Sequence, residues 1–502
     1  MRPLHFTIAK NAVANIVRGG ASAVVSIVLP HFLTRWLGPD RFAGWALMLQ
    51  VAAYANYLDF GLQTAVARYL AGALERNDHA ERDRLLSNAV AILCVAGAVA
   101  FFVLAVIAWQ LPHLFRSVPS GLSGEIGSGL LILGLCAAIG LPLSAYTGVL
   151  IGMQRNEYPA IAIGGSRLAG AVAVVLVARQ THSLAWLALC IGGFNLVGGV
   201  VQRAIAKRLL PGVKLRFAAL DRATTAELIR YCSALSVWSF AMLLVSGLDV
   251  TIVGFFNFQA VGAYSIASTF IMFFTGLTGA AFSAMLAPVA VLQARREYSR
   301  IARLVIVTTR LNSYFSLGMI IAALLFGRKL IVAWVGPGYL PVTLPVLQIL
   351  LVAQAIRLVG NACGTTLVGM GLQRYGLFPV LFEGVLNLTL SLVGILLIGP
   401  TGVAWATLIA ASIAIAVTIF FVIPRVQELD IRRGMFVWQG VVLPLIPFLP
   451  VGLWLAWRHW SHRATAARGM IAILVEGLVV LLTITLVSLG IAGTRQGILR
   501  EQ

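Results

Sequence analysis

A row of polar side chains runs along the first apolar stretch of the chain. Asn11, Asn15, Arg18, Ser22 and Ser26 follow one another at steps of 4, 3, 4 and 4 residues, which places them on one face of an α-helix. A polar face of this length requires water or polar partners, because lipid satisfies no hydrogen-bonding group. Amide and guanidinium donors on one face could bind an anion. We therefore predict that Asn11, Asn15 and Arg18 line a hydrated cavity.

The second apolar stretch adds a carboxylate and another guanidinium, those of Asp59 and Arg68. Asp59 could form an ion pair with Arg18, or it could line the same cavity. Arg68 lies near the end of its stretch, where an anchor in the membrane interface is the alternative to a role in the cavity. We predict that both residues contribute to the cavity.

Polar rows recur in two later stretches. The first row has steps of 3, 4 and 4 residues and consists of Gln354, Arg357, Asn361 and Thr365. The second row has steps of 4 and 4 residues and consists of Glu383, Asn387 and Ser391. We predict that Arg357 and Asn361 also bind substrate. Arg357 and Glu383 could instead pair with each other.

Charged side chains inside these apolar stretches are costly. An ionised group at the centre of a bilayer costs roughly 2.5–3.5 kcal/mol on the insertion scale, so it requires a partner, water or a function. The charged residues within the stretches have opposite signs in equal number, so mutual neutralisation is the alternative for each: Arg18, Arg167, Arg310, Arg357, Asp59, Asp249, Glu383 and Glu476. Asp59, Asp249 and Glu383 are the candidates for binding a coupling proton or cation.

Arginine in a hydrated intramembrane cavity favours one class of ligand. Its planar set of donors matches the oxygens of a phosphate group. An amphiphile with a diphosphate head could place its phosphates near Arg18 and leave its tail in the lipid. A cavity for organic cations would instead present exposed acids.

The elements that carry these residues belong to a membrane protein. The chain has 502 residues, of which 60% are hydrophobic and 11% charged, and its mean hydropathy is +0.94. A soluble globular protein has about 25% charged residues. This composition excludes a soluble enzyme, a disordered chain and a coiled coil, and the long apolar runs exclude an outer-membrane barrel. The predicted fold class is an all-α, polytopic membrane protein.

We predict 14 transmembrane helices, each long enough to cross a hydrocarbon core of about 30 Å. They cover residues 10–35, 42–67, 86–109, 126–150, 159–178, 184–206, 227–254, 261–290, 300–327, 342–368, 376–398, 402–424, 438–457 and 468–490. Lys and Arg gather in alternate loops, and the positive-inside rule then places both termini in the cytoplasm. The net charge of +20, from 37 Lys and Arg against 17 Asp and Glu, is interpreted as topogenic charge beside anionic lipid and not as a nucleic-acid surface.

The basic loop between the sixth and seventh spans divides the chain. A weak repeat supports this division, since LGPDRFAGWAL (37–47) and FNFQAVGAYSI (256–266) both place small residues before an aromatic. We predict a six-helix lobe at 1–206, a cytoplasmic linker at 207–226, a second six-helix lobe at 227–424, and two additional helices with a tail at 425–502.

Several kinds of chemistry have no motif in this sequence. No GxxxxGK[ST] or HExxH pattern occurs, and the five cysteines lie singly within apolar stretches. The loops predicted outside are short for a catalytic domain. We therefore expect no metal site, no cofactor and no enzymatic activity.

Two stretches resemble a known family. TRWLGPDRFAGWALMLQ (34–50) with LDFGLQTAVARYLAGALE (58–75), and SGLDVTIVGFFNFQAVGAYSIAS (246–268), resemble the Wzx-type flippases for O-antigen and exopolysaccharide precursors, of the MOP exporter superfamily. Asp59, Gly61 and Arg68 match that family's second helix, and Asp249 matches its junction of the seventh and eighth helices. The resemblance implies two six-helix bundles around a central cavity, with two extra C-terminal helices.

The resemblance also implies a function. Members of this family move an oligosaccharide linked to undecaprenyl diphosphate across the bacterial inner membrane by alternating access, alongside membrane lipids and the polysaccharide polymerase or export machinery. Their cavity arginines are thought to meet the diphosphate, which points to Arg18 first and then to Arg68. The roles of Arg357 and Glu383 rest on the polar rows alone.

Three alternatives remain open at this point. A drug or cation antiporter of the same superfamily and a flippase for the peptidoglycan lipid precursor would share the fold. A membrane-embedded glycan ligase or transferase would require a folded outer groove with a carboxylate or histidine. The identity of the sugars, the coupling ion and the oligomeric state have no signal in the sequence.

Overall fold

The computed structural model of the chain describes residues 24–212, 215, 220–283 and 285–450. All regular structure in these ranges is helical. Ten of the described helices are long and apolar enough to cross a membrane, and Val24–Trp36 and Arg433–Phe448 are shorter apolar helices. The predicted all-α, polytopic fold is therefore confirmed. The last predicted span, 468–490, lies outside the described residues.

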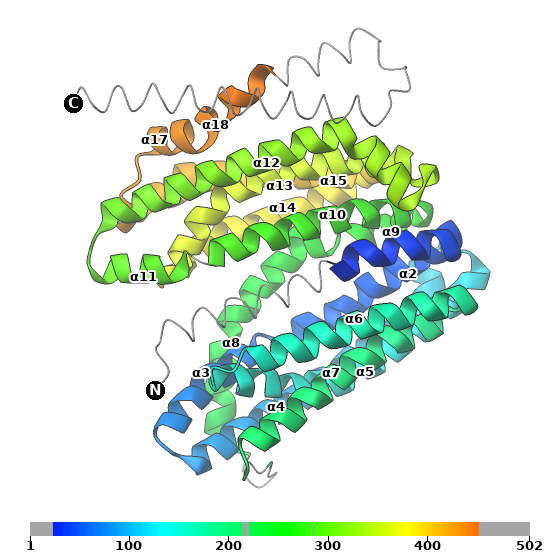
Figure 1. The fold of residues 1–502 in the computed structure, drawn as a ribbon, viewed down its shortest axis with the longest axis horizontal. Coiled ribbons are helices and arrows are strands. Elements are labelled where there is room, and N and C mark those ends of the chain that lie inside the picture. Colours follow the sequence, from blue (N-terminus) through cyan, green and yellow to red (C-terminus); the bar gives the residue numbers. More distant parts are fainter. Residues whose placement is uncertain (1–23, 213–214, 216–219, 284, 451–502) are drawn as a thin grey trace. The chain divides into compact units, whose positions relative to one another are not determined.

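The first half of the chain is a helical bundle centred on α5. Its elements are α2 (Gly38–Ala53), the 3-10 helix η1 (Tyr54–Asp59), α3 (Leu62–Glu75), α4 (His79–Leu114), α5 (Ser120–Gly152), α6 (Glu157–Gln180) and α7 (Leu184–Leu209). The central helix α5 packs against α2, α3, α4 and α7, while α6 packs against α7. Figure 1 shows α4, α5, α6 and α7 running side by side.

Glycines let α3 and α5 approach closely. A Cβ atom on Gly148 would lie 2.6 Å from the carbonyl oxygen of Gln63, and one on Gly152 would lie 2.7 Å from that of Ala67. Small residues at a spacing of four are typical of close helix contacts in membranes. This contact fixes α3, which carries Arg68, directly against α5.

The predicted continuous helix at 42–67 is wrong. The chain ends α2 at Ala53, tightens into η1, and then turns through Phe60 and Gly61, whose φ angles are 51° and 74°. Glycine adopts this left-handed conformation at little cost, and Gly61 begins the new helix α3. The break places Asp59 at the end of η1 rather than on a smooth helical face.

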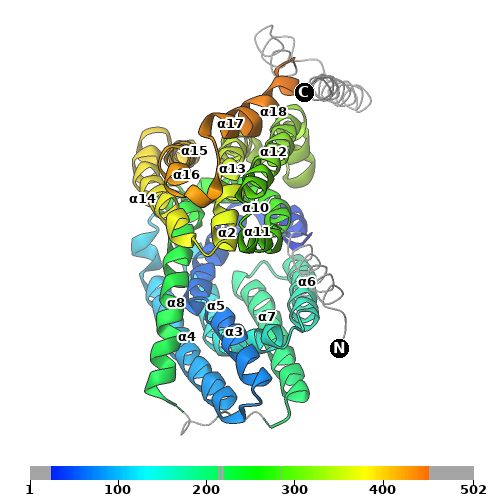
Figure 2. The same ribbon diagram turned by 90° about the vertical axis from the view of Figure 1, so that its left-hand side faces the viewer.

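The predicted helices at 227–254 and 261–290 are also interrupted. The first consists of α8 (Arg222–Met242), the π-helix η3 (Leu243–Gly247) and α9 (Asp249–Phe256), and the second of α10 (Phe258–Ser283) and α11 (Leu286–Ala294). Figure 2 shows α8 beside α4, with which it is in contact. The interruption before α9 makes Asp249 the first residue of that helix.

The remaining elements complete the described chain. They are α12 (Tyr298–Val335), η4 (Pro337–Tyr339), α13 (Leu340–Gly369), α14 (Gln373–Ile398), α15 (Pro400–Val417), η5 (Thr418–Val422), α16 (Ile423–Arg425), η6 (Gln427–Leu429), α17 (Arg433–Val437), η7 (Trp438–Val442), α18 (Leu443–Leu445) and η8 (Ile446–Phe448). A single residue, Gly399 at φ 66°, separates α14 from α15.

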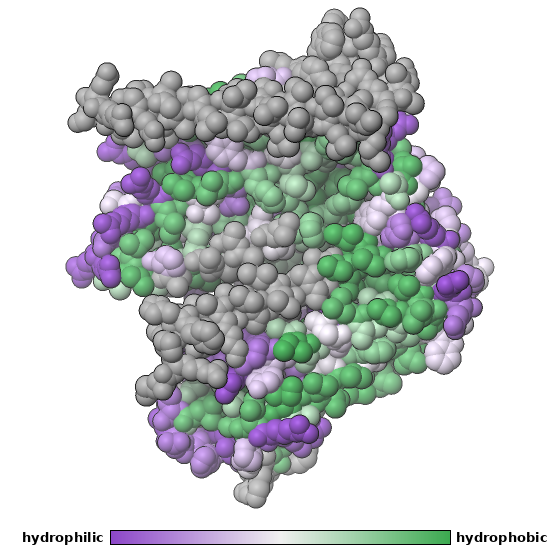
Figure 3. All heavy atoms as spheres, viewed as in Figure 1, coloured by the Kyte–Doolittle hydropathy of each residue, from purple (hydrophilic) through white to green (hydrophobic). Residues whose placement is uncertain are grey.

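The chain forms two compact units. The first consists of Met1–Ala280, Ile331–Leu347 and Val380–Ala410, and the second of Ala281–Leu330, Gln348–Pro379 and Ala411–Gln502. Large apolar side chains are exposed, among them Phe102 at 69% and Trp109 at 76% on α4. Hydrophobic residues dominate the face in Figure 3, and hydrophilic residues gather near helix ends. Such a surface suits contact with lipid.

Candidate functional site

The predicted site residues fall into three groups. Asn11, Asn15 and Arg18 lie outside the described residues, so their place in a cavity stays a prediction. Asp59 and Arg68 lie in the first unit, together with Asp249 and Glu383. Arg357 and Asn361 lie in the second unit.

Asp59 lies at the break between η1 and α3. Its side chain is half-buried, and the Ser144 hydroxyl on α5 donates a hydrogen bond of 3.4 Å to Asp59 Oδ1. Within the described ranges, no Lys or Arg forms a salt bridge with Asp59. The position of this carboxylate depends on the break, because the left-handed turn at Phe60 and Gly61 follows it directly. No pattern in the sequence predicted the contact of Ser144 with Asp59.

Arg68 on α3 is exposed and lies against an aromatic ring of α8. Its guanidinium carbon is 5.3 Å from the centre of the Tyr231 ring, a distance that suits a cation–π interaction. The neighbouring Tyr69 contacts the same ring edge-to-face, with 5.8 Å between ring centres. Tyr231, which packs against Tyr69, therefore fixes the exposed Arg68 guanidinium at the contact of α3 and α8.

Asp249 is buried, at 6% exposure, to the same extent as Glu383, and helices distant in sequence converge on it. The Tyr264 hydroxyl on α10 and the Thr407 hydroxyl on α15 donate to Oδ2 at 3.5 and 3.4 Å. The Asn387 amide on α14 donates to Oδ1 at 3.4 Å. Helices α10, α14 and α15 therefore each bring a polar group to the Asp249 carboxylate of α9. Of the residues in this cluster, the sequence pattern predicted only Asn387 and Asp249 as intramembrane polar residues.

The π-helix before Asp249 supplies further acceptors. A wider helical turn leaves carbonyl oxygens without their usual i+4 partner. The Asn387 amide donates to the Val245 carbonyl at 2.9 Å, and the Gln50 amide on α2 donates to the Gly247 carbonyl at 2.7 Å. Gln50 on α2 therefore also contributes to this site.

Tyr54 completes the contact between α2 and the Asp249 region. Its hydroxyl donates to the Gly247 carbonyl at 2.9 Å and also contacts the Thr251 hydroxyl on α9. Since the Tyr54 proton goes to the carbonyl, the Thr251 hydroxyl donates to Tyr54. The first residue of η1 therefore contacts Gly247, just before the start of α9, and Thr251, within its first turn.

The other predicted residues lie on α13 and α14. Arg357 donates from Nη1 to the Gln354 side-chain oxygen at 3.3 Å, one step back in the predicted polar row, and Asn361 is exposed. Glu383 is buried on α14, one helical turn before Asn387. The polar row of α14 therefore places Glu383 on the same helix face as a residue that contacts Asp249.

The described part of the chain offers no cluster of three or more His, Cys, Asp or Glu that could hold a metal ion. All five cysteines are free thiols. The described side chains offer the carboxylates of Asp59 and Asp249, which accept hydrogen bonds from hydroxyl and amide groups, and the exposed guanidinium of Arg68.

Comparisons with known proteins place this arrangement in a family. A model of the polysaccharide biosynthesis protein family matches residues 8–291, which include Arg18, Asp59, Arg68 and Asp249. A Shigella flexneri protein named as an O-antigen transporter is 25% identical over 182 residues, or 36% of this chain. The chain spans 43% of the length of that relative.

Two solved structures share the fold. An inward-facing multidrug resistance MATE family transporter of the MOP superfamily has a TM-score of 0.68 and 15% identity, covering 83% of this chain and 99% of its own. The lipid II flippase MurJ in an inward closed conformation has a TM-score of 0.73 and 13% identity, covering 95% of this chain and 98% of its own. The fold seen here is therefore that of MOP-superfamily transporters, and, because its model matches more than half of the sequence, the chain belongs to the polysaccharide biosynthesis protein family.

Proposed function

We propose that this protein is a flippase that moves an oligosaccharide linked to undecaprenyl diphosphate across the bacterial inner membrane, for the synthesis of O-antigen or exopolysaccharide. The observation that carries the proposal is the family match over residues 8–291. That range holds the polar row of Asn11, Asn15 and Arg18 and the second-span residues Asp59 and Arg68. The short stretch similar to an O-antigen transporter supports the same substrate class.

In this proposal the arginines bind the diphosphate. Arg18 would supply a planar pair of donors to the phosphate oxygens, and Asn11 and Asn15 would add neutral donors on the same helix face. Arg68 would add a second guanidinium from α3, and Arg357 with Asn361 would act from α13. The polyprenyl tail would stay in lipid, since its transfer into water would cost about 0.8 kcal/mol for each CH₂ group.

We assign ion coupling first to Asp249, with Asp59 and Glu383 as the other candidates. Support comes from the burial of Asp249 and from its three neutral hydroxyl and amide partners, Tyr264, Asn387 and Thr407. Burial makes a charged carboxylate costly and so favours the binding of a proton or a small cation. Loading and release of that proton or cation would bias the transporter between two states.

Transport would follow an alternating-access cycle. The lobes 1–206 and 227–424 would rock about a central cavity, connected by the cytoplasmic segment 207–226 and accompanied by the helices in 425–502. Both termini would lie in the cytoplasm, since the basic loops concentrate on that side. Polysaccharide polymerase or export proteins would take up the delivered substrate.

The proposal is tested in a deletion strain. The wild-type gene is expected to restore surface polysaccharide, while Arg18→Ala restores at least about tenfold less, because a bidentate charged contact is lost. Arg179→Ala, which removes an exposed charge in the last turn of α6, serves as the matched control. Full surface polysaccharide from Arg18→Ala would contradict diphosphate capture.

The antiporter alternative makes a different prediction. A drug or cation antiporter would change drug susceptibility on deletion and leave surface polysaccharide intact. A peptidoglycan-precursor flippase would instead be required for growth. The deletion phenotype therefore separates the three transport functions before any variant is made.

A further inference from the structure

A pocket opens at the end of α7, and its lining includes none of the site residues described above. Its volume is about 230 Å³. Arg203 and Lys207 on α7 and Tyr146 on α5 form its polar side, and Leu86 on α4 and Leu210 form part of its apolar wall. All of these residues belong to the first unit.

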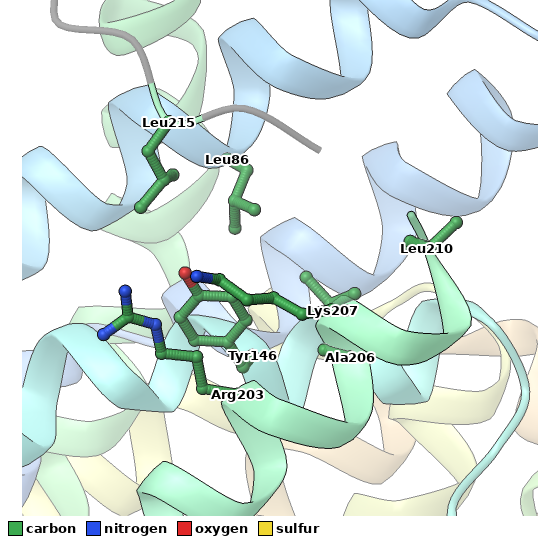
Figure 4. A pocket seen from close by; sticks show the side chains of 8 residues that line it. Leu86, Tyr146, Arg203, Ala206, Lys207, Leu210 and Leu215 are labelled. Atoms are coloured by element: carbon green, nitrogen blue, oxygen red, sulfur yellow. The ribbon is translucent and has the colours of Figure 1, made fainter. Parts of the chain in front are cut away.

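The two cationic side chains line the same pocket. Arg203 and Lys207 are four residues apart and therefore lie on one face of α7. Figure 4 shows the Lys207 side chain extending along the Tyr146 ring, with its ammonium and the Arg203 guanidinium both on the side of the Tyr146 hydroxyl. The Arg203 guanidinium carbon is 6.0 Å from the centre of that ring, which restricts where the group can point.

The positive charge of the pocket has no acidic counterpart nearby. Among the residues that the structure describes, no carboxylate forms a salt bridge with Arg203 or Lys207. Both side chains are exposed, whereas Tyr146 and Ala206 behind them are buried. An anion entering the pocket would therefore meet two charges without displacing an existing ion pair.

The position of the pocket in the membrane points to a lipid ligand. The candidate span that forms α7 is Leu184–Leu209, so Arg203 and Lys207 lie in its last two turns, at the level of lipid headgroups. Binding sites for whole drug-sized ligands enclose about 300–1,000 Å³. The smaller volume here suits a phosphate headgroup, and the apolar wall suits the first carbons of a chain attached to it.

We infer that this pocket binds the phosphate group of a membrane amphiphile, with an anionic phospholipid as the ligand. Arg203 offers a planar pair of donors to the phosphate oxygens, Lys207 adds a point charge, and the Tyr146 hydroxyl adds a neutral donor. A polyprenyl diphosphate presents the same chemistry from a second source, so the experiment includes both lipids.

The test uses the full-length protein purified in detergent. Native mass spectrometry measures the binding of phosphatidylglycerol, undecaprenyl diphosphate and the uncharged lipid diacylglycerol. The double variant Arg203→Gln/Lys207→Gln is compared with Arg208→Gln/Arg230→Gln, which removes two exposed charges from α7 and α8 outside the pocket lining.

Phosphatidylglycerol binding is expected to fall at least about tenfold in the pocket variant and to stay within about twofold of wild type in the control. Diacylglycerol binding is expected to be unchanged in both. Leu210→Trp, which fills the pocket without changing charge, is expected to lower phosphatidylglycerol binding as well. Each variant is first shown to be folded by its thermal unfolding temperature.

Two results would overturn the inference. Equal losses of phosphatidylglycerol binding in the pocket variant and the control would mean that surface charge attracts the lipid and that the pocket is not a specific binding site. If the pocket variant lost binding of undecaprenyl diphosphate but kept binding of phosphatidylglycerol, the ligand of the pocket would be the substrate carrier and not a phospholipid. Retained transport in a folded variant that has lost phosphatidylglycerol would separate this site from the proposed function.

Discussion

The hydroxyl of Tyr54, the first residue of η1, donates a hydrogen bond of 2.9 Å to the carbonyl oxygen of Gly247, the last residue of the π-helix. The same carbonyl accepts from Gln50, one helical turn earlier on α2. A residue of the second span and the residues just before Asp249 are thereby joined, although nearly two hundred positions separate them in sequence. These hydrogen bonds connect the region of Asp59 with the region of Asp249.

The first prediction tests this connection. Tyr54→Phe removes the hydroxyl and is expected to lower the free energy of unfolding by about 1 kcal/mol, the usual net value of one hydrogen bond. The measurement is thermal or denaturant unfolding in detergent micelles. Tyr57→Phe is the control, since the Tyr57 hydroxyl has no hydrogen bond with another described residue, and it is expected to unfold like wild type. Equal losses in both variants would assign the effect to the ring environment.

The second prediction concerns Asp249. Asp249→Asn keeps the size of the side chain and removes its charge. The remaining oxygen can still accept from the Asn387 amide, and the new amide group can donate to the hydroxyls of Tyr264 and Thr407, which rotate to accept. We expect transport in proteoliposomes to lose its response to an imposed proton or sodium gradient, while the unfolding temperature stays near that of wild type. Gradient-stimulated transport by Asp249→Asn would move the coupling role to Asp59 or Glu383, whose Asn and Gln variants are measured in parallel.

The third prediction distinguishes the contribution of the Arg68 charge to ligand binding from that of its contact with the Tyr231 ring. Arg68→Ala is expected to weaken binding of undecaprenyl diphosphate, because a guanidinium donor is lost. Tyr231→Phe retains the aromatic ring and is expected to bind like wild type, whereas Tyr231→Leu loses an exposed cation–π contact worth about 0.5–1 kcal/mol and binds more weakly. Binding that is unaffected in Arg68→Ala would leave Arg68 as an interfacial anchor.

The fourth prediction addresses the glycine contact between α3 and α5. Gly148→Ala places a methyl group 2.6 Å from the Gln63 carbonyl oxygen, and we expect a loss of about 1–3 kcal/mol, the usual cost of overpacking. Gly165 on α6 has open space around its Cα, so Gly165→Ala is the matched control. That control is expected to be neutral or more stable by up to about 1 kcal/mol, through helix propensity. Similar unfolding of the two variants would argue against the close contact.

The fifth prediction uses pH at the start of α8. The Thr224 backbone amide, then the Thr224 hydroxyl and the Ala223 amide, donate hydrogen bonds to the Asp221 carboxylate and lower its pKa. A lowered pKa in the folded protein means that this cap stabilises the helix above the unfolded pKa of about 3.9 and is lost as the pH falls through the folded value.

Hydrogen exchange of the amides at 223 and 224 measures this cap directly. Protection is expected to fall as the pH decreases below about 4 in the wild type, after correction for the intrinsic exchange rate. In Asp221→Asn the corrected protection should not change over that range. A parallel decrease in the variant would show that another group controls the start of α8.

Much of the fold was predictable from the sequence because apolar runs bounded by polar loops determine where helices cross a membrane. The turn before Pro400 is one example, where Gly399 in a left-handed conformation separates α14 from α15. The breaks inside the spans were not predictable in the same way. Hydropathy is as high through the π-helix as in its flanks, and Phe60 adopts a positive φ that its residue type does not favour.

The candidate site was only partly predictable for a related reason. Helical spacing shows which residues share a face of one helix, and it singled out Asp249 and Asn387 as intramembrane polar residues. It carries no information on which helices meet, so the contacts of Tyr264 and Thr407 with Asp249 emerge only from the fold. Arg203 and Lys207 were counted with the charges of the linker region, and their convergence on Tyr146 depends on the packing of α7 against α5.

The spare carbonyl of the π-helix has a consequence for motion. A backbone acceptor that is held by side chains, and not by its own helix, can exchange those donors for water without unwinding any turn. Breaking the Gln50 and Tyr54 hydrogen bonds to Gly247 would then cost only about 0.5–1.5 kcal/mol for each bond. These two bonds can therefore break and re-form while the helices on either side keep their own backbone hydrogen bonds.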